Sequence, residues 1–201
     1  MHTKKHPTLK GAWTVIKYQN ALAGLKLYEP EDRVFTLRQI HSDRIVYLEE
    51  EWHLEGDAII TTRKNFPIGV RTADCVPMAF LGKEAVGVVH AGWRGIKANI
   101  VEKFLERFLK IEEDPLVFVG PSAKACCYEV GQEFRHGFIF LHHKNGRLFL
   151  DTQLEVLHRI KSFGVKRIIT YNQCTICSEK FPSYRRDKTS QRMLVFALLE
   201  A

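Results

Sequence analysis

The sequence lacks the features that mark membrane-spanning, secreted and repetitive proteins. No stretch approaches the roughly 20 consecutive apolar residues that cross a bilayer. No apolar run follows the basic start MHTKKHPTLKGAW, as a secretory signal requires. No repeat, linker or low-complexity segment divides the chain. We therefore expect a single cytoplasmic domain over residues 1–201 that contacts no membrane.

The sequence is also short of acidic residues. It has 30 Lys and Arg residues against 23 Asp and Glu residues, a formal net charge of +7. This charge favours anionic ligands such as phosphate. Acidic residues interrupt the basic ones, as in EKFLERFLKIEED, and no basic stripe with an aromatic platform is visible. A small anion is therefore the expected partner, and a nucleotide or RNA binder without turnover is kept as an alternative.

The five cysteines do not form the even set of a disulfide framework. Cys174 and Cys177 have the CxxC spacing of metal ligands, but no second CxxC is present. Adjacent Cys126 and Cys127 do not supply one. We therefore expect reduced, structural thiols at these four positions, with Cys174 and Cys177 buried rather than part of a zinc ribbon. Cys75 is expected to be the functional thiol.

The most informative stretch is GVRTADCVPMAFLGKEAVGVVHAGWRG, residues 69–95. It contains two short apolar strands, the first running into Asp74 and Cys75 and the second into His90. The periodicity of apolar residues then predicts a helix over Ile96 to Leu109. A strand holds the residue at its end rigidly, so this order is typical of a site that carries chemistry.

Two histidines and one cysteine in the sequence are candidates for a metal site. His41, Cys75 and His90 each follow a predicted strand at a turn, and strands of one mixed sheet can bring such ends together. Two imidazoles and one thiolate suit zinc, and three protein ligands leave a fourth position for water. A surface histidine and a buried cysteine are the common alternatives, which spacing alone leaves open.

Other polar residues are candidates for substrate binding and proton transfer. Gly92 and Arg94 lie where the predicted helix begins, so free N–H groups and a planar guanidinium are available to phosphate. Arg185 is a second candidate residue for binding an anionic or aromatic ligand. For both arginines a solvated surface position is the alternative. Asp74 and Glu129 are candidate general acids or bases, and Asp74 is equally suited to orienting a ligand.

Predicted strands outnumber predicted helices and do not alternate with them regularly. This pattern favours an α+β protein with a mixed sheet over a doubly wound fold.

Several motifs together resemble the YfiH-type family, also called the multicopper polyphenol oxidoreductase or laccase-domain family. They are HSD, GDAIITT, TADCVPM, GVVHAGWRGI and CCYEVG, with CT and SYRRD in the tail, and they cover residues 34–200. The resemblance implies a four-layer α/β/β/α fold with mixed β-sheets, cytotoxic-necrotizing-factor-like in type. It also implies that His41, Cys75 and His90 bind zinc.

The resemblance further implies a purine nucleoside enzyme. The expected reactions are phosphorolysis of adenosine, inosine and methylthioadenosine, and deamination of adenosine. The alternatives are a metal-free thiol hydrolase, with a cysteine nucleophile and a histidine base, and copper-dependent oxidation of phenols. The residues assigned to this chemistry are, for catalysis, Cys75, His90 and Asp74 and, for substrate binding, Arg94, Gly92 and Arg185.

Two regions depart from the family pattern. The Gly-Gly-Val-Ser and Asn-Leu-Gly motifs usual ahead of HSD are not recognisable, and the tail loop has Lys188 and Gln191 where the family usually has glycines. Substrate contacts from these two regions are therefore not carried over to this chain.

Overall fold

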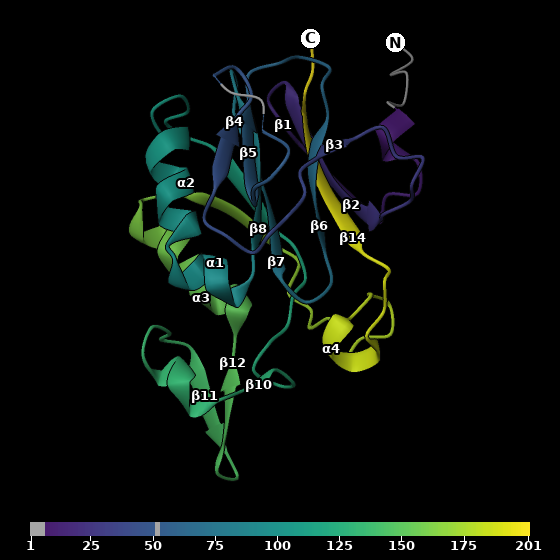
Figure 1. The fold of residues 1–201 in the computed structure, drawn as a ribbon. Helices are drawn as coiled ribbons and strands as arrows, with labels where there is room; N and C mark the ends of the chain where they lie inside the picture. The colour runs from purple at the N-terminus through teal and green to yellow at the C-terminus, as the bar shows by residue number, and fades with distance from the viewer. Residues whose placement is uncertain (1–6, 51–52) are drawn as a thin grey trace.

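Two large β-sheets dominate the computed structural model of the protein, which describes residues 7–50 and 53–201 (Figure 1). The five-stranded sheet has the spatial order β1 (Thr14–Tyr18), β2 (Ala21–Leu27), β14 (Met193–Leu199), β6 (Ile68–Thr72) and β3 (Phe35–Thr36). The six-stranded sheet has the order β13 (Arg167–Thr170), β9 (Leu116–Val119), β7 (Val76–Leu81), β8 (Val86–Ala91), β5 (Ala58–Thr61) and β4 (Ile45–Tyr47). Both sheets mix parallel and antiparallel pairs. The predicted α+β class with mixed sheets is confirmed.

The core lies on both faces of the six-stranded sheet, and β7 shows how it is divided. Ala79 and Leu81 pack between the two sheets, whereas Met78 and Phe80 pack on the opposite, helical face. Successive side chains of a strand point to opposite faces, so a strand covered on both sides needs apolar residues throughout. Every residue of β7 and β8 is buried, which explains why both stretches are almost continuously apolar.

Three helices cover the outer face of the six-stranded sheet: α1 (Trp93–Lys97), α2 (Ile100–Phe108) and α3 (Thr152–Ser162) (Figure 1). The prediction of one helix over Ile96 to Leu109 is wrong, because the chain breaks at Asn99. That residue has a left-handed backbone with φ of 64°, a conformation that asparagine tolerates. Ile96 and Ile100 are both buried, so the apolar spacing carries no sign of the break.

Loop residues cover the outer face of the five-stranded sheet. Here Leu22 and Phe196 pack against Leu9 of the 3-10 turn η1 (Pro7–Leu9) and against Tyr28 and Val34. In the part of the chain that the structure describes, this outermost layer is therefore built from loops rather than from an α-helix.

Small elements gather at one end of the two sheets (Figure 1). A three-stranded sheet of β10 (Glu129–Val130), β12 (Arg147–Leu150) and β11 (Leu141–Lys144) is accompanied by η2 (Gln132–Arg135), and α4 (Tyr184–Asp187) precedes β14. Among the described residues no helix has the length and apolarity needed to cross a membrane.

Candidate active site

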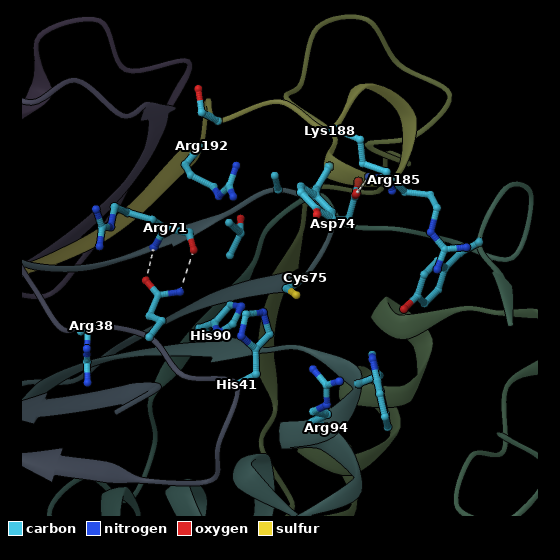
Figure 2. Close-up of a pocket in the computed structure, with 17 residues that line it drawn as sticks. Arg38, His41, Arg71, Asp74, Cys75, His90, Arg94, Arg185, Lys188 and Arg192 are labelled. Atoms are coloured by element: carbon cyan, nitrogen blue, oxygen red, sulfur yellow. Dashed lines mark hydrogen bonds between the residues drawn. The ribbon is translucent and has the colours of Figure 1, made fainter. Parts of the chain in front are cut away.

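The structure brings His41, Cys75 and His90 together. The atoms that these side chains offer to a metal all lie within 4.8 Å of one another. Figure 2 shows the two imidazoles beside the Cys75 sulfur, and their ring centroids are 4.9 Å apart. Zinc–nitrogen bonds of about 2.0 Å and zinc–sulfur bonds of about 2.3 Å place tetrahedral ligand atoms roughly 3.3–3.6 Å apart, a separation that lies within the 4.8 Å limit of this group.

Strand pairing explains how residues distant in sequence meet. Cys75 immediately precedes β7, and His90 lies in β8, whose Ala91 pairs with Val76. The antiparallel register therefore places the cysteine next to the histidine at the same end of the sheet. His41 reaches the same point from the turn after β3, where it adopts a left-handed backbone with φ of 59°.

A buried carboxylate, Asp57, fixes both histidines. Its Oδ1 lies 2.8 Å from His90 Nδ1 and accepts a bond from the His41 backbone N–H at 3.0 Å. Its Oδ2 accepts bonds from the Ser42 N–H and hydroxyl, both at 2.7 Å. Because Nδ1 of His90 is bonded to Asp57, Nε2 is the ring nitrogen left to face His41 and Cys75. A carboxylate orients a metal-ligating imidazole in the same way.

Asp57 was not among the residues predicted to carry function, although it belongs to the GDAIITT motif. Its signal in the sequence is an aspartate at the entry to a fully buried strand, β5. A buried charge must be paired or hydrogen-bonded, and such a position therefore indicates a partner elsewhere in the fold.

Asp57→Asn is expected to lower the affinity for zinc, the metal predicted for this donor set, about 10–100-fold, which is the usual cost of losing the hydrogen-bond partner of a metal ligand. The asparagine NH₂ group cannot accept the N–H bonds that reach a carboxylate oxygen. Competition with a zinc chelator measures the loss. Asp43→Asn is the matched control, because Asp43 lies in the same turn, is only half-buried and pairs with Lys103 rather than with a candidate ligand. Equal affinity in the two variants would contradict the role of Asp57.

Gly92 lies directly against the three candidate ligands. A Cβ at this position would be 3.0 Å from Cys75 Sγ and 3.2 Å from His41 Cδ2. The backbone itself is extended, with φ of −78°, so close approach rather than conformation requires glycine here. The structure thus places the predicted phosphate-binding glycine as part of the wall behind the cysteine and histidine.

The protonation states of Cys75 and His90 depend on each other. Burial raises the pKa of the Cys75 thiol, but the charge of His90 and hydrogen bonds from His41 and His90 outweigh burial and lower the pKa to about 6. Burial lowers the pKa of His90, but the Cys75 charge and the bond to Asp57 raise it to about 9. The two shifts together favour a thiolate beside an imidazolium in the metal-free pair.

The three side chains open into a cavity of about 1050 Å³. Figure 2 shows labelled cationic side chains around it, from Arg94 on one side to Lys188 and Arg192 on the other. Asp74 is the only acidic residue in its described lining. An excess of positive charge in a concave site attracts small anions. The cationic residues of the lining are Arg38, Arg71, Arg94, Arg185, Lys188 and Arg192.

Asp74 and Arg185 lie in this cavity and contact each other. The Asp74 carboxylate accepts a bond from the Arg185 backbone N–H at 2.7 Å and another from the Thr175 hydroxyl at 2.6 Å. The Arg185 guanidinium lies over the Tyr128 ring, 4.7 Å from its centroid. Glu129 is exposed and faces Arg147 outside the cavity.

The other cysteines differ from expectation. The prediction that Cys174 and Cys177 are both buried is wrong: Cys177 is exposed and Cys174 is half-buried. Cys126 is exposed as well. The two cysteine pairs also lie close to each other in space.

Fold and site together define an α+β protein with a His–Cys–His group in a cationic cavity. The chain belongs to the multi-copper polyphenol oxidoreductase laccase family, which matches residues 14–200. It is 44% identical to a purine nucleoside phosphorylase of Aquifex aeolicus over 99% of both chains. It is 32% identical to the purine nucleoside phosphorylase YfiH of Escherichia coli, over 81% of this chain and 72% of that one.

Solved structures support the fold. A Neisseria meningitidis protein of the DUF152 group has a TM-score of 0.81 at 22% identity, covering 94% of this chain and 99% of its own. YlmD from Geobacillus stearothermophilus has a TM-score of 0.77 at 22% identity, covering 98% of this chain and 94% of its own. At this identity the likeness concerns the fold alone.

Proposed function

We propose that this protein is a zinc-dependent purine nucleoside phosphorylase that acts on adenosine, inosine and methylthioadenosine and also deaminates adenosine. One observation carries the proposal: His41, Cys75 and His90 converge within 4.8 Å at a cavity lined by six cationic side chains. The relatives named purine nucleoside phosphorylase support the substrate class. The similarity to the Aquifex aeolicus protein covers 99% of both chains, so this support applies to nearly the whole sequence.

The donor set fits zinc. Two imidazole nitrogens and one thiolate are ligands that zinc takes in catalytic sites, with a position left for water or substrate. Asp57 supplies the outer hydrogen bond that such a site needs. When bound, zinc would act as a Lewis acid and lower the pKa of a coordinated water.

For phosphorolysis, the cationic lining binds and orients inorganic phosphate. A phosphate oxygen forms a bond to the ribose anomeric carbon while the bond from that carbon to the purine nitrogen breaks. The bonding electrons leave with the base, which takes up the proton that the phosphate gives up. The second product is ribose 1-phosphate, or its methylthio derivative when methylthioadenosine is the substrate. Arg94 neutralises phosphate charge in this scheme, since a guanidinium offers two parallel donors to an oxyanion.

The same cavity offers contacts to the nucleoside. Tyr128 and Trp93 line it, each with an arginine guanidinium over one face of its ring. Aromatic side chains of this kind suit a purine base. Asp74 is assigned an orienting role, because both its oxygens already accept bonds from the loops that carry Thr175 and Arg185.

Deamination needs water rather than phosphate. Water adds to the purine carbon that bears the amino group, that carbon–nitrogen bond breaks, and ammonia leaves with the proton that water gave up. His41, Cys75 and His90 would hold the zinc ion beside the cavity, and the ion would supply a binding position for this water.

Of the two alternatives, one has an observation in its favour. The thiolate–imidazolium pair of Cys75 and His90 is the arrangement of a metal-free thiol hydrolase. Copper chemistry of the multicopper type needs several histidine-rich ligand sets. Across residues 7–50 and 53–201, two groups of potential metal ligands converge and only one contains histidine.

The experiment is a turnover screen of purified protein with adenosine, inosine and methylthioadenosine, with and without phosphate. Free base with ribose 1-phosphate identifies phosphorolysis, and inosine with ammonia identifies deamination. His41→Ala should lose both, while His143→Ala should keep both, since His143 is exposed on β11. Absence of all nucleoside turnover in zinc-loaded protein would rule the proposal out. Turnover that persists in zinc-free protein would favour the thiol hydrolase.

Lys188→Gly should stabilise the fold and weaken phosphate binding. Lys188 has a left-handed backbone with φ of 54°, which costs a non-glycine residue about 1–2 kcal/mol. Part of this is offset by the entropy of glycine in the unfolded chain. A net gain of about 1 kcal/mol corresponds to a melting temperature about 2–4 °C higher in a chain of this size.

The same substitution removes one charge from the cavity, so KM for phosphate should rise about fivefold, equivalent to about 1 kcal/mol for a solvent-accessible ion pair. Thermal unfolding and phosphate titration measure the two effects separately. Asn145→Gly is the matched control, because Asn145 has φ of 52° in the β11–β12 turn, outside the cavity. An unchanged KM for phosphate in Lys188→Gly would remove Lys188 from the binding site.

A further inference from the structure

A second cluster of metal-ligating side chains lies outside the candidate active site. Cys126 and Cys127 lie between β9 and β10, and Cys174 and Cys177 lie between β13 and α4. Their four sulfur atoms all lie within 4.8 Å of one another. The closest contact joins Cys126 Sγ and Cys177 Sγ at 3.1 Å, and all four thiols are free.

The backbone, rather than contact between the thiols, brings the two pairs together. Strands β9 and β13 are parallel neighbours, so the loops that follow them leave the same edge of the sheet. Ser122 N–H donates to the Gln173 carbonyl at 3.3 Å, and Thr175 N–H donates to the Ser122 carbonyl at 3.1 Å. The adjoining turn is closed by bonds from the Cys127 and Tyr128 N–H groups to the Lys124 carbonyl.

Hydrophobic packing does not account for this convergence. A cysteine kept for packing is a small buried residue, but Cys126 and Cys177 are exposed and Cys127 is half-buried. The spacing has a chemical explanation instead. Four thiolates at about 2.3 Å from one zinc ion have sulfur atoms about 3.8 Å apart. That separation lies between the 3.1 Å contact and the 4.8 Å limit of the cluster.

We propose that Cys126, Cys127, Cys174 and Cys177 bind one Zn²⁺ ion in a closed, all-thiolate site. Four protein ligands leave no position for substrate, so the ion has a structural role. Each thiol releases its proton on binding, as a thiolate ligand requires. This assignment does not depend on the proposed nucleoside chemistry, because none of the four cysteines lines the large cavity.

The ion would tie together the loops that form one wall of that cavity. Tyr128 follows Cys127 directly, and its ring lies under the Arg185 guanidinium. Thr175 lies between the second pair of cysteines and donates its hydroxyl to Asp74. The guanidinium of Arg186 caps the same loop by donating to the carbonyls of Thr175, Ile176, Ser178 and Phe181. The cluster therefore positions cavity residues without contacting the substrate.

The test uses a chain in which only these four cysteines remain. The double variant His41→Ala/Cys75→Ala removes two ligands of the other group, so any remaining zinc reports on the four-cysteine cluster. One equivalent of zinc per chain is expected by elemental analysis. Titration with a thiol reagent should find four reactive thiols after chelation and about none after Zn²⁺ is restored. Substitution with Co²⁺ should give the absorption of a tetrahedral thiolate complex.

Adding Cys126→Ser and Cys177→Ser should remove the bound zinc and the cobalt absorption. These two positions are exposed, so the exchange of sulfur for oxygen disturbs little packing, and circular dichroism checks the fold. If this variant does not fold, the thiol count in the parent decides the question without it. The proposal is overturned if the parent binds no zinc, if zinc leaves the four thiols reactive, or if mass spectrometry finds Cys126 and Cys177 in a disulfide.

Discussion

Cys75→Ala is expected to abolish nucleoside turnover and to lower zinc affinity at the His41–Cys75–His90 group more than 100-fold. The thiolate is the only anionic group among the three proposed ligands, and without it two neutral imidazoles are left. Loss of a partner that merely supports a ligand costs about 10–100-fold in affinity, so loss of a ligand itself should cost more. The fold should persist, because a sulfur atom is removed at a position beside an open cavity.

Zinc titration, thermal unfolding and both nucleoside assays together measure this result. The zinc content of Cys75→Ala should fall by one equivalent, while the equivalent assigned to the four-cysteine cluster is retained. His41→Ala should reproduce the loss, and His143→Ala should not. A Cys75→Ala protein that keeps zinc at His41 and His90 and turns over adenosine would show that the cysteine is neither ligand nor nucleophile.

The sequence predicts His41, Cys75 and His90 at strand ends, and in the structure Cys75 and His90 lie at adjoining ends of β7 and β8. The order of strands in the sheet supplied the remaining information. Alternating and continuous apolar runs predict the strands, but they do not state which strands are neighbours. Here the β7–β8 pairing brings Cys75 to His90, and the turn held by Asp57 brings His41. The family motifs, rather than spacing, connected the three residues.

Asp57 shows what a pattern of residue types leaves out. Its role depends on four donors within three consecutive residues of a turn distant in sequence, and on one imidazole from β8. None of these contacts leaves a periodic signal. A carboxylate at the start of a buried strand indicates that a partner exists, but not which one.

The four-cysteine cluster was missed for a different physical reason. Zinc motifs are recognised by two CxxC pairs, and here one pair is the adjacent Cys126 and Cys127. The missing information was that β9 and β13 are parallel neighbours, since ends of parallel strands meet at one edge of a sheet. Once β9 and β13 are known to be neighbours, the cysteine pairs that follow these two strands are predicted to lie close together.

Arg94→Ala is expected to reduce phosphorolysis of adenosine about 100-fold and to change its deamination by only a few-fold. Arg94 lies in the cavity beside the His–Cys–His group, with its guanidinium 4.7 Å from the Trp93 ring centroid. Only phosphorolysis has an anionic co-substrate. Removing a preorganised donor to developing or transferred negative charge typically costs about 10²–10³ in rate.

The guanidinium rather than the helix should carry this effect. Helix α1 has only five residues, Trp93–Lys97, and the field of a helix terminus comes from aligned peptide dipoles, of which so short a helix has few. Arg94→Lys should therefore recover part of the phosphorolysis, because it restores the charge but not the paired donors. Arg107→Ala is the matched control, since Arg107 is exposed on α2.

Rates for both reactions, measured over a range of phosphate concentrations, separate the possible roles of Arg94. A rise in KM for phosphate with unchanged deamination identifies an anion-binding residue. Unchanged rates in both reactions would mean that the side chain is solvated and has no part in either. Equal losses in both would mean that Arg94 maintains the structure of the site, for example through its contact with Trp93. In that case the phosphate would have to be held by the cations on the opposite side of the cavity, of which Arg71 and Arg192 are the first to substitute.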